Sequence, residues 1–379
     1  MVPRRRLHMP SRHARFSPSS ADRYIHCTPS LRLGEEHGPP DTGSVYTAEG
    51  TEAHELGEFL LRTSLGETMD DPRPSMTYYC DEMQECAEGY RDTVLELYEQ
   101  FEGASLCIEQ RIDFSRFVPG GFGTSDCVIV GDGKLIVVDF KYGKGVSVSA
   151  EDNSQLKCYA LGAYEIFSAL YEIEEITLVI YQPRISNYSK WSLTREDLLS
   201  WAENTLAPAA ALAARGAGEF SSGPWCRFCR AKAVCRKRAE ENLKLAQYDF
   251  ARPDTLEEDE INLILSKIDD LIRWAEDIKG YALRKALSGF VWDDWKAVEG
   301  RSNRVFSDEE KVAKAVEEAG FSPYETKLRS VSSMEKMLGK KTFQELLGDL
   351  VKRPPGSPAL VSRSDKRPEM QVDPLADFS

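Results

Sequence analysis

The chain has 379 residues, which is enough for two domains or for one large domain with appendages. Its composition, 41% hydrophobic and 29% charged, is that of a globular protein, and no apolar run approaches the roughly 18 residues of a membrane-spanning helix. The formal net charge of −14 argues against a surface that is basic throughout, although a single basic groove is compatible with it. The basic start of the chain has no apolar stretch after it, so we expect no secretory signal and a cytoplasmic location.

The N-terminal part is predicted to be helical after a disordered start. Residues 1–16 lack apolar periodicity, and we expect them to be disordered. A proline at position 18 among serines predicts the start of a short helix that ends before Pro29. Residues 34–47 are expected to form a loop. Apolar spacing then predicts two longer amphipathic helices, over residues 49–64 and 80–102.

A group of strands follows, and the pair Asp132-Gly133 predicts a hairpin within it. Apolar runs predict strands over residues 105–114, 125–130, 134–140 and 176–181. Helices are expected on either side of the last strand, over residues 152–169 and 194–215. This order predicts an α/β fold with a central mixed sheet flanked by helices.

In the C-terminal part, a long stretch with a helical pattern ends near residue 287, and the sequence pattern differs after it. Two short amphipathic helices, over residues 307–319 and 332–348, indicate a small, mainly helical appended domain. The predicted parts are a core over residues 17–245, a helical connector over 246–288, the appended domain over 289–352, and an extended or disordered tail over 353–379.

Two carboxylates and a lysine are predicted to meet at one edge of the sheet. Asp139 and Lys141 end an apolar strand and alternate onto one face, and Asp126 lies across the hairpin from them. The carbonyl of Phe140 and the carboxylate of Glu109 offer further hard oxygen ligands. Such a set can bind Mg²⁺ or Mn²⁺ and hold a cation beside an attacking water, as phosphodiester cleavage requires. The alternative is a surface ion pair at a strand end.

Three further side chains could complete this site. Gln155 and Tyr159 are four residues apart and therefore share one helix face, from which an amide and a hydroxyl can hold a phosphate or a water. His54 offers an imidazole for a metal or for positioning a substrate. The alternatives are a polar helix face and a structural histidine.

Four of the nine cysteines form a second constellation. Cys226, Cys229 and Cys235 have the spacing C-x₂-C-x₅-C, which is typical of metal ligands when no disulfide framework is expected. Cys27 is the candidate fourth ligand, and a core thiol is the alternative reading for it. The spacing leaves tetrahedral zinc and a [4Fe–4S] cluster equally open.

With these motifs the chain resembles the PD-(D/E)XK nuclease superfamily, in its RecB-like branch with an iron–sulfur cluster. The strongest resemblance is to prophage-encoded proteins known only as a domain of unknown function, and the chain is also similar to CRISPR-associated adaptation exonucleases. The likeness covers about residues 14–240. In the prophage-encoded family it extends through the tail, where residues 298–304 and 338–341 look characteristic.

The resemblance implies a restriction-endonuclease-like core whose ends are stapled by a cysteine-bound [4Fe–4S] cluster. It implies a DNA exonuclease that depends on Mg²⁺ or Mn²⁺ and acts in phage or prophage recombination or replication inside a bacterial host. The implied partners are single-stranded DNA or duplex ends, and a single-strand annealing protein. The residues that match the family's site motifs are His54, Asp126, Asp139, Lys141, Gln155 and Tyr159, and those that match its cluster ligands are Cys27, Cys226, Cys229 and Cys235.

Two alternatives stay open. One is a catalytically silent DNA-binding or scaffold protein of a phage recombination complex, with residues 289–352 as a docking module. The other is a zinc-ribbon DNA-binding regulator. Basic residues around the cysteines either line a phosphate-binding path or form a solvated helix face. These residues are Arg227, Arg230, Lys232, Arg236, Lys237 and Arg238.

Overall fold

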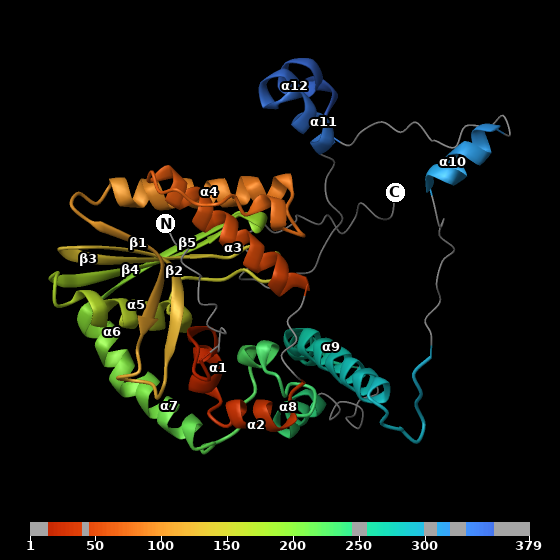
Figure 1. Cartoon of the computed structure of the whole chain (residues 1–379). Helices are drawn as coiled ribbons and strands as arrows, with labels where there is room; N and C mark the ends of the chain where they lie inside the picture. Colours follow the sequence, from red (N-terminus) through yellow and green to blue (C-terminus); the bar gives the residue numbers. More distant parts are fainter. Residues whose placement is uncertain (1–13, 40–44, 245–255, 299–308, 319–330, 352–379) are drawn as a thin grey trace, which may run out of the picture. The chain divides into compact units, whose positions relative to one another are not determined.

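The computed structural model describes residues 14–39, 45–244, 256–298, 309–318 and 331–351. The chain divides into two units, residues 1–297 and 298–379 (Figure 1). The described residues of the second unit form three short α-helices: α10 (Glu309–Glu318), α11 (Val331–Leu338) and α12 (Lys340–Leu347). The predicted tail over residues 353–379 lies outside the described residues.

The first unit is an α/β structure built on five strands. The strands are β1 (Ser105–Asp113), β2 (Phe122–Gly131), β3 (Gly133–Phe140), β4 (Ile173–Gln182) and β5 (Asn187–Thr194). The helices that precede the sheet are α1 (Ala21–His26), α2 (Ser30–His37), α3 (Val45–Ser64) and α4 (Asp81–Glu99). The later helices are α5 (Ser154–Phe167), α6 (Arg195–Trp201), α7 (Ala207–Ala214), α8 (Arg236–Leu243) and α9 (Glu258–Leu287).

The strands lie in sequence order across the sheet, and only β3 and β4 run parallel. A parallel pair needs a crossover, and α5 supplies it. The predicted Asp132-Gly133 turn joins β2 to β3, where Gly133 has a φ of 86°, a conformation that glycine adopts at little cost. The predicted α/β fold with a central mixed sheet and flanking helices is therefore confirmed.

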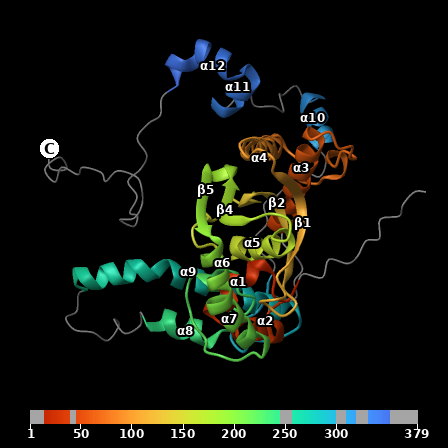
Figure 2. The same cartoon turned by 90° about the vertical axis from the view of Figure 1, so that its left-hand side faces the viewer.

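Helices cover both faces of the sheet (Figures 1 and 2). On one face, Ile136, Val138 and Phe140 of β3 pack with apolar side chains of α3 and α4. On the other face, Leu135 and Val137 pack with α1, α5, α6 and α7. The alternation along β3 thus fills two cores, which explains why this strand is apolar at almost every position.

The structure differs from the sequence-based elements in three places. The loop predicted over residues 34–47 is wrong in part, because α2 extends to His37 and α3 begins at Val45. Strand β5 was not predicted; it is an edge strand whose side chains alternate between half-buried and exposed up to the buried Leu193, so its apolar signal is weak. Phe16 is 2% exposed and packs edge-on against Tyr24, so ordered packing begins before residue 17.

Candidate active site

The ends of β2 and β3 bring two acidic side chains together. The β2–β3 register pairs Cys127 with Val138, and the next step along the ladder places Asp126 opposite Asp139. The two residues are only 9% and 2% exposed. A buried carboxylate loses its hydration, so hydrogen-bond or charged partners must offset that loss.

Asp126 is held from two sides. Its Oδ1 lies 3.1 Å from Nδ1 of His54 on α3, and its Oδ2 accepts a hydrogen bond of 2.7 Å from the backbone N–H of Phe140. The Phe140 backbone therefore contacts this site through its N–H, whereas the sequence predicted a role for its carbonyl. Ligation of a metal by the Phe140 carbonyl stays a prediction.

Glu109 joins this pair through an unusual backbone conformation. It lies within β1 but has a φ of 50°, in the left-handed region that a glutamate rarely adopts. Ligand atoms of Glu109, His54 and Asp126 all lie within 4.8 Å of one another. Strain of this kind persists where the surrounding structure requires it, often at functional sites.

Asp139 belongs to a second, adjoining network with Lys141. The Lys141 ammonium lies 2.9 Å from Oδ2 of Asp139 and donates to its Oδ1 over 3.2 Å. It also donates to Oε1 of Gln155 on α5, over 3.3 Å. The Gln155 amide in turn donates to the Tyr159 hydroxyl over 3.0 Å, and it approaches Oδ1 of Asp139 at 3.4 Å. Residues from β3 and α5 thus form one connected polar chain.

The electrostatics of the site reflect burial opposed by charge pairing. Burial alone would lower the pKa of His54, but attraction to Asp126 outweighs it and raises this pKa to about 9. Burial, followed by repulsion from Asp126, raises the pKa of Glu109 to about 7. For Asp139, burial is again the largest cause of a raised pKa, and Lys141 opposes it. The carboxyl groups of Glu109 and Asp126 are thus held close together, and a bound cation would reduce the repulsion between them.

The donor set fits a hard divalent cation. Glu109 and Asp126 offer carboxylate oxygens, which are the ligands that suit Mg²⁺ or Mn²⁺, and His54 adds an imidazole nitrogen. Asp139 Oδ2 is buried and accepts no well-aligned hydrogen bond from the described residues, although Lys141 is its ionic partner. This oxygen can therefore accept a further ligand. Asp139 lies outside the compact group of three, so the structure gives Glu109 a more central place than the sequence suggested.

One neighbouring residue was not predicted from the sequence. Tyr90 of α4 stacks on Phe140 with ring centroids 4.9 Å apart, and its buried hydroxyl has no hydrogen-bond partner among the described residues. Gly57 of α3 makes room for this ring, because an added Cβ there would lie 3.1 Å from it. The only sequence signal was a glycine inside a helix, which marks close packing but does not identify the packed residue.

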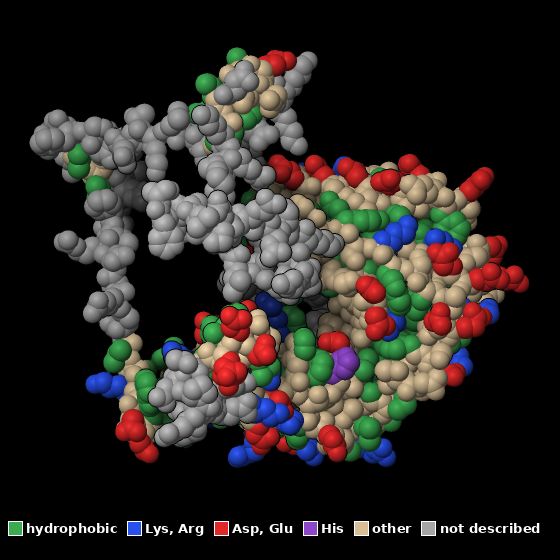
Figure 3. All heavy atoms as spheres, turned by 180° about the vertical axis from the view of Figure 1, so that it is seen from behind, with side chains coloured by type: hydrophobic (Ala, Val, Ile, Leu, Met, Phe, Trp, Pro, Cys, Tyr) green, Lys and Arg blue, Asp and Glu red, His purple; other side chains and the backbone are tan. Residues whose placement is uncertain are grey.

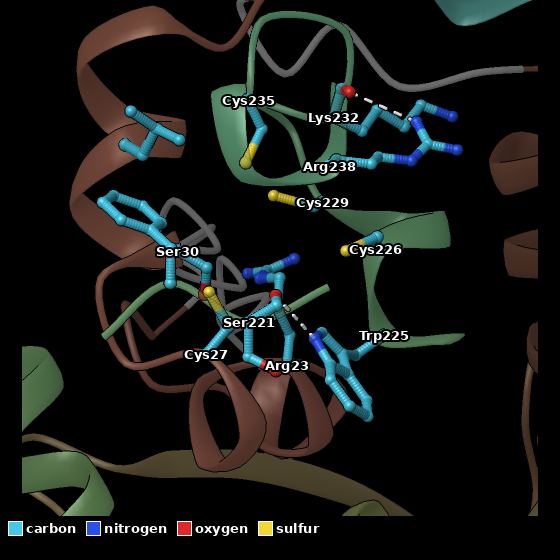
Figure 4. Close-up of a pocket in the computed structure, with 12 residues that line it drawn as sticks. Arg23, Cys27, Ser30, Ser221, Trp225, Cys226, Cys229, Lys232, Cys235 and Arg238 are labelled. Atoms are coloured by element: carbon cyan, nitrogen blue, oxygen red, sulfur yellow. Dashed lines mark hydrogen bonds between the residues drawn. The ribbon is translucent and has the colours of Figure 1, made fainter. Parts of the chain in front are cut away.

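The four candidate cysteine ligands line one pocket (Figure 4). Cys27 follows α1, while Cys226, Cys229 and Cys235 come from the segment that precedes α8. This segment is anchored on α1, where His26 and Trp225 stack with ring centroids 4.4 Å apart. The tertiary structure therefore brings Cys27 to the other three across about half the chain.

Backbone hydrogen bonds and burial act in opposite directions on the pKa of the Cys27 and Cys229 thiols. The backbone N–H groups of Ser221 and Ser30 point at Cys27, and that of Ala231 points at Cys229. Burial is nevertheless the largest effect and raises the pKa of both thiols. Across the described residues, no three of the four sulfur atoms lie within 4.8 Å of one another, so the thiols are not gathered around a point the size of a single ion.

The basic residues near the cysteines are not equivalent. Arg238 is buried and pairs with Asp277 of α9 at 2.6 Å, and Lys237 pairs with Glu241 at 3.0 Å. Both are thus committed to structural contacts. In the view from behind, acidic side chains lie across the upper surface of the first unit and several Lys and Arg side chains line its lower side (Figure 3).

A family model described as "Protein of unknown function (DUF2800)" matches residues 13–368. The chain belongs to this family. The predicted resemblance to a family of unknown function is confirmed at this level, and the match includes both constellations of this DUF2800 member. Assignment to the PD-(D/E)XK superfamily stays a prediction.

Two solved structures show limited similarity. One, "Crystal structure of SSO0001", shares 17% identity, with 50% of this chain and 98% of that chain covered and a TM-score of 0.24. The other, a "Putative exonuclease" from Eubacterium rectale, shares 13% identity, with 59% of this chain and 89% of that chain covered and a TM-score of 0.35. Both scores are low, and the α/β fold follows from the sheet and helices of this chain.

Within the described part of the chain, no helix combines the length and the apolar character needed to cross a bilayer.

Proposed function

We propose that this DUF2800 member is a metal-dependent deoxyribonuclease of the PD-(D/E)XK type that hydrolyses phosphodiester bonds as an exonuclease. One observation carries the proposal: a compact His54, Glu109 and Asp126 group adjoins the buried Asp139–Lys141 pair at one edge of the sheet. Phosphodiester hydrolysis needs metal-binding oxygens and a nearby cation that is not itself a metal ligand. Both are present at this edge.

The proposed metal ligands are Asp126 and Glu109 with His54 in support, and Asp139 and the Phe140 carbonyl complete the set. A bound Mg²⁺ or Mn²⁺ supplies Lewis-acid stabilisation of the charge that develops on the phosphate. The Phe140 N–H holds Asp126 in place through its second oxygen, so the carboxylate is fixed before any ligand arrives.

Lys141 is the proposed residue that orients the attacking water. Its ammonium is fixed by Asp139 and Gln155, and its side chain is 27% exposed, so it can reach both the buried carboxylate and a substrate. Because Asp139 raises the pKa of Lys141 against the effect of burial, the amine stays charged and stabilises negative charge on the phosphate. Gln155 and Tyr159 are proposed to position the scissile phosphate.

The cysteine pocket is proposed to hold a [4Fe–4S] cluster that staples α1 to the segment before α8. Zinc bonds of about 2.3 Å in a tetrahedron would place ligand sulfurs roughly 3.8 Å apart. Among the described residues, no three of these sulfurs lie within 4.8 Å of one another, which is compatible with a larger group. Arg23, which lies in the same pocket, offsets the charge that such a group and its thiolates would carry.

The proposed substrate is DNA, as single strands or duplex ends, and such a substrate is consistent with a cytoplasmic role. The resemblance found in the sequence supports phage or prophage recombination or replication as the setting, with a single-strand annealing protein as a partner. A catalytically silent DNA-binding or scaffold protein remains the alternative function.

A cleavage assay on end-labelled DNA tests this proposal. The protein with Mn²⁺ should release nucleotides from the ends, and EDTA or the substitution Asp139→Asn should abolish release. Asp92→Asn is the matched control, because Asp92 is an exposed aspartate of α4 that pairs with neighbouring Arg91. DNA binding without cleavage under any divalent metal would instead establish the catalytically silent alternative.

A further inference from the structure

A second pocket, of about 380 Å³, lies between the end of α2, the cysteine segment and α9. This volume is in the range of sites that hold small organic ligands. The pocket shares Cys229 and Lys232 with the cysteine pocket, so it borders the proposed cluster. None of the residues that line this pocket belongs to the candidate active site around Asp126 and Asp139.

Its lining is cationic in a chain whose net charge is −14. Of its two acidic residues, Asp277 is already paired with Lys232 at 2.8 Å and with Arg238 at 2.6 Å. Arg227 and Arg284 form no ion pair within the described residues. Arg227 donates one long hydrogen bond, of 3.4 Å, to a backbone carbonyl. Their guanidinium groups are thus available to an external anion.

Two aromatic rings line this pocket beside the arginines, the exposed Phe228 and the half-buried Tyr281. Phe228 is 71% exposed although it is entirely apolar, and the guanidinium carbon of Arg227 lies 5.9 Å from its ring centroid. Tyr281 of α9 lines the opposite side of the pocket. Guanidinium groups next to exposed aromatic faces are what proteins use to bind single-stranded nucleic acid, with phosphates on the cations and bases stacked on the rings.

One contact links this pocket to the candidate active site. The Arg227 guanidinium donates to the carbonyl of Gly145, which lies in the loop after β3 and only four residues beyond Lys141. A strand bound along the cysteine segment would therefore pass the loop that leads to the catalytic edge.

We infer that this pocket binds one nucleotide unit of a single DNA strand, with its phosphate on Arg227 and Arg284 and its base stacked on Phe228. Its residues are distinct from those proposed to cut the bond, and it holds the strand that the active site processes. The choice of DNA as the ligand rests on the proposed function.

Binding is measured with the full chain and a fluorescein-labelled oligothymidine of 20 nucleotides, by anisotropy in EDTA so that no cleavage occurs. The variants are Phe228→Ala, and Arg227→Ala combined with Arg284→Ala. Tyr188→Ala and Arg116→Ala are the matched controls, because these residues are exposed elsewhere on the first unit, at 51% for Tyr188 and with a 65% exposed side chain for Arg116. Circular dichroism and the iron content of each variant verify that its fold and cysteine site are intact.

We expect Phe228→Ala to weaken binding about tenfold, the usual effect of removing one stacked base. The double arginine variant should lower the slope of log affinity against log salt by about 0.7 for each phosphate that it no longer neutralises. Wild-type affinity and salt slope in both variants, with folding verified, would overturn the inference even if the protein cleaves DNA. The expected losses without any Mn²⁺-dependent cleavage would support the pocket and refute the nuclease proposal.

Discussion

The ion pair between Asp126 and His54 makes a quantitative prediction for the metal-free protein. The substitution Asp126→Asn keeps the size and one oxygen of the side chain but removes the charge that lies 3.1 Å from the imidazole. Because burial disfavours a charged imidazole and Asp126 is what opposes it, the pKa of His54 should fall from about 9 to its ordinary value near 6.5 or below.

The same change should alter how stability depends on pH. A pKa raised from about 6.5 to about 9 corresponds to roughly 3 kcal/mol, and screening at a side chain that is 31% exposed reduces this to about 2 kcal/mol. Since the folded-state pKa is the higher one, this stabilisation is fully present below pH 6.5 and is lost as the pH rises through 9.

The assay combines histidine titration by NMR with urea unfolding at pH 6 and pH 9.5, both in EDTA. The stability difference between the wild type and Asp126→Asn should shrink by about 2 kcal/mol between the two pH values. Glu55→Gln is the control, because Glu55 is an exposed neighbour on α3. A His54 pKa that is the same in wild type and Asp126→Asn, or a stability difference independent of pH, would refute the electrostatic account.

Four further predictions concern the two sites. Lys141→Met should lower the rate at saturating Mn²⁺ by about 10²-fold or more, and an unchanged rate constant would rule out its role. Glu109→Gly should raise the free energy of unfolding in urea by about 1 kcal/mol, because it relieves the strain of a φ of 50°. The same variant should bind Mn²⁺ more weakly in calorimetry. Glu109→Gln keeps the strained backbone and is the control for the gain in stability. Mn²⁺ affinity should rise as the pH passes about 7, where the Glu109 carboxyl of the metal-free protein loses its proton; a pH-independent affinity would contradict this. Cys27→Ser should remove iron and brown colour from anaerobically purified protein and lower its melting temperature, whereas the exposed Cys80→Ser should change neither.

The sequence by itself determined the features that depend on neighbours along the chain. Apolar runs identified β3 and β4, and the alternation along β3 put Asp139 and Lys141 on one face, where the structure has them 2.9 Å apart. The spacing of Gln155 and Tyr159 likewise follows from one turn of helix. Short-range periodicity is enough for such features, because the geometry of a strand or a helix fixes where nearby side chains point.

Only the tertiary structure decided which distant segments meet. It put His54 of α3 against Asp126, and Cys27 into the pocket of the later cysteines. It also turned the backbone of Glu109 toward these residues, which no pattern in β1 indicated. The physical reason is that contacts between segments far apart in the chain depend on how the two cores pack on the sheet, and the spacing of residues in a single sequence does not encode that packing.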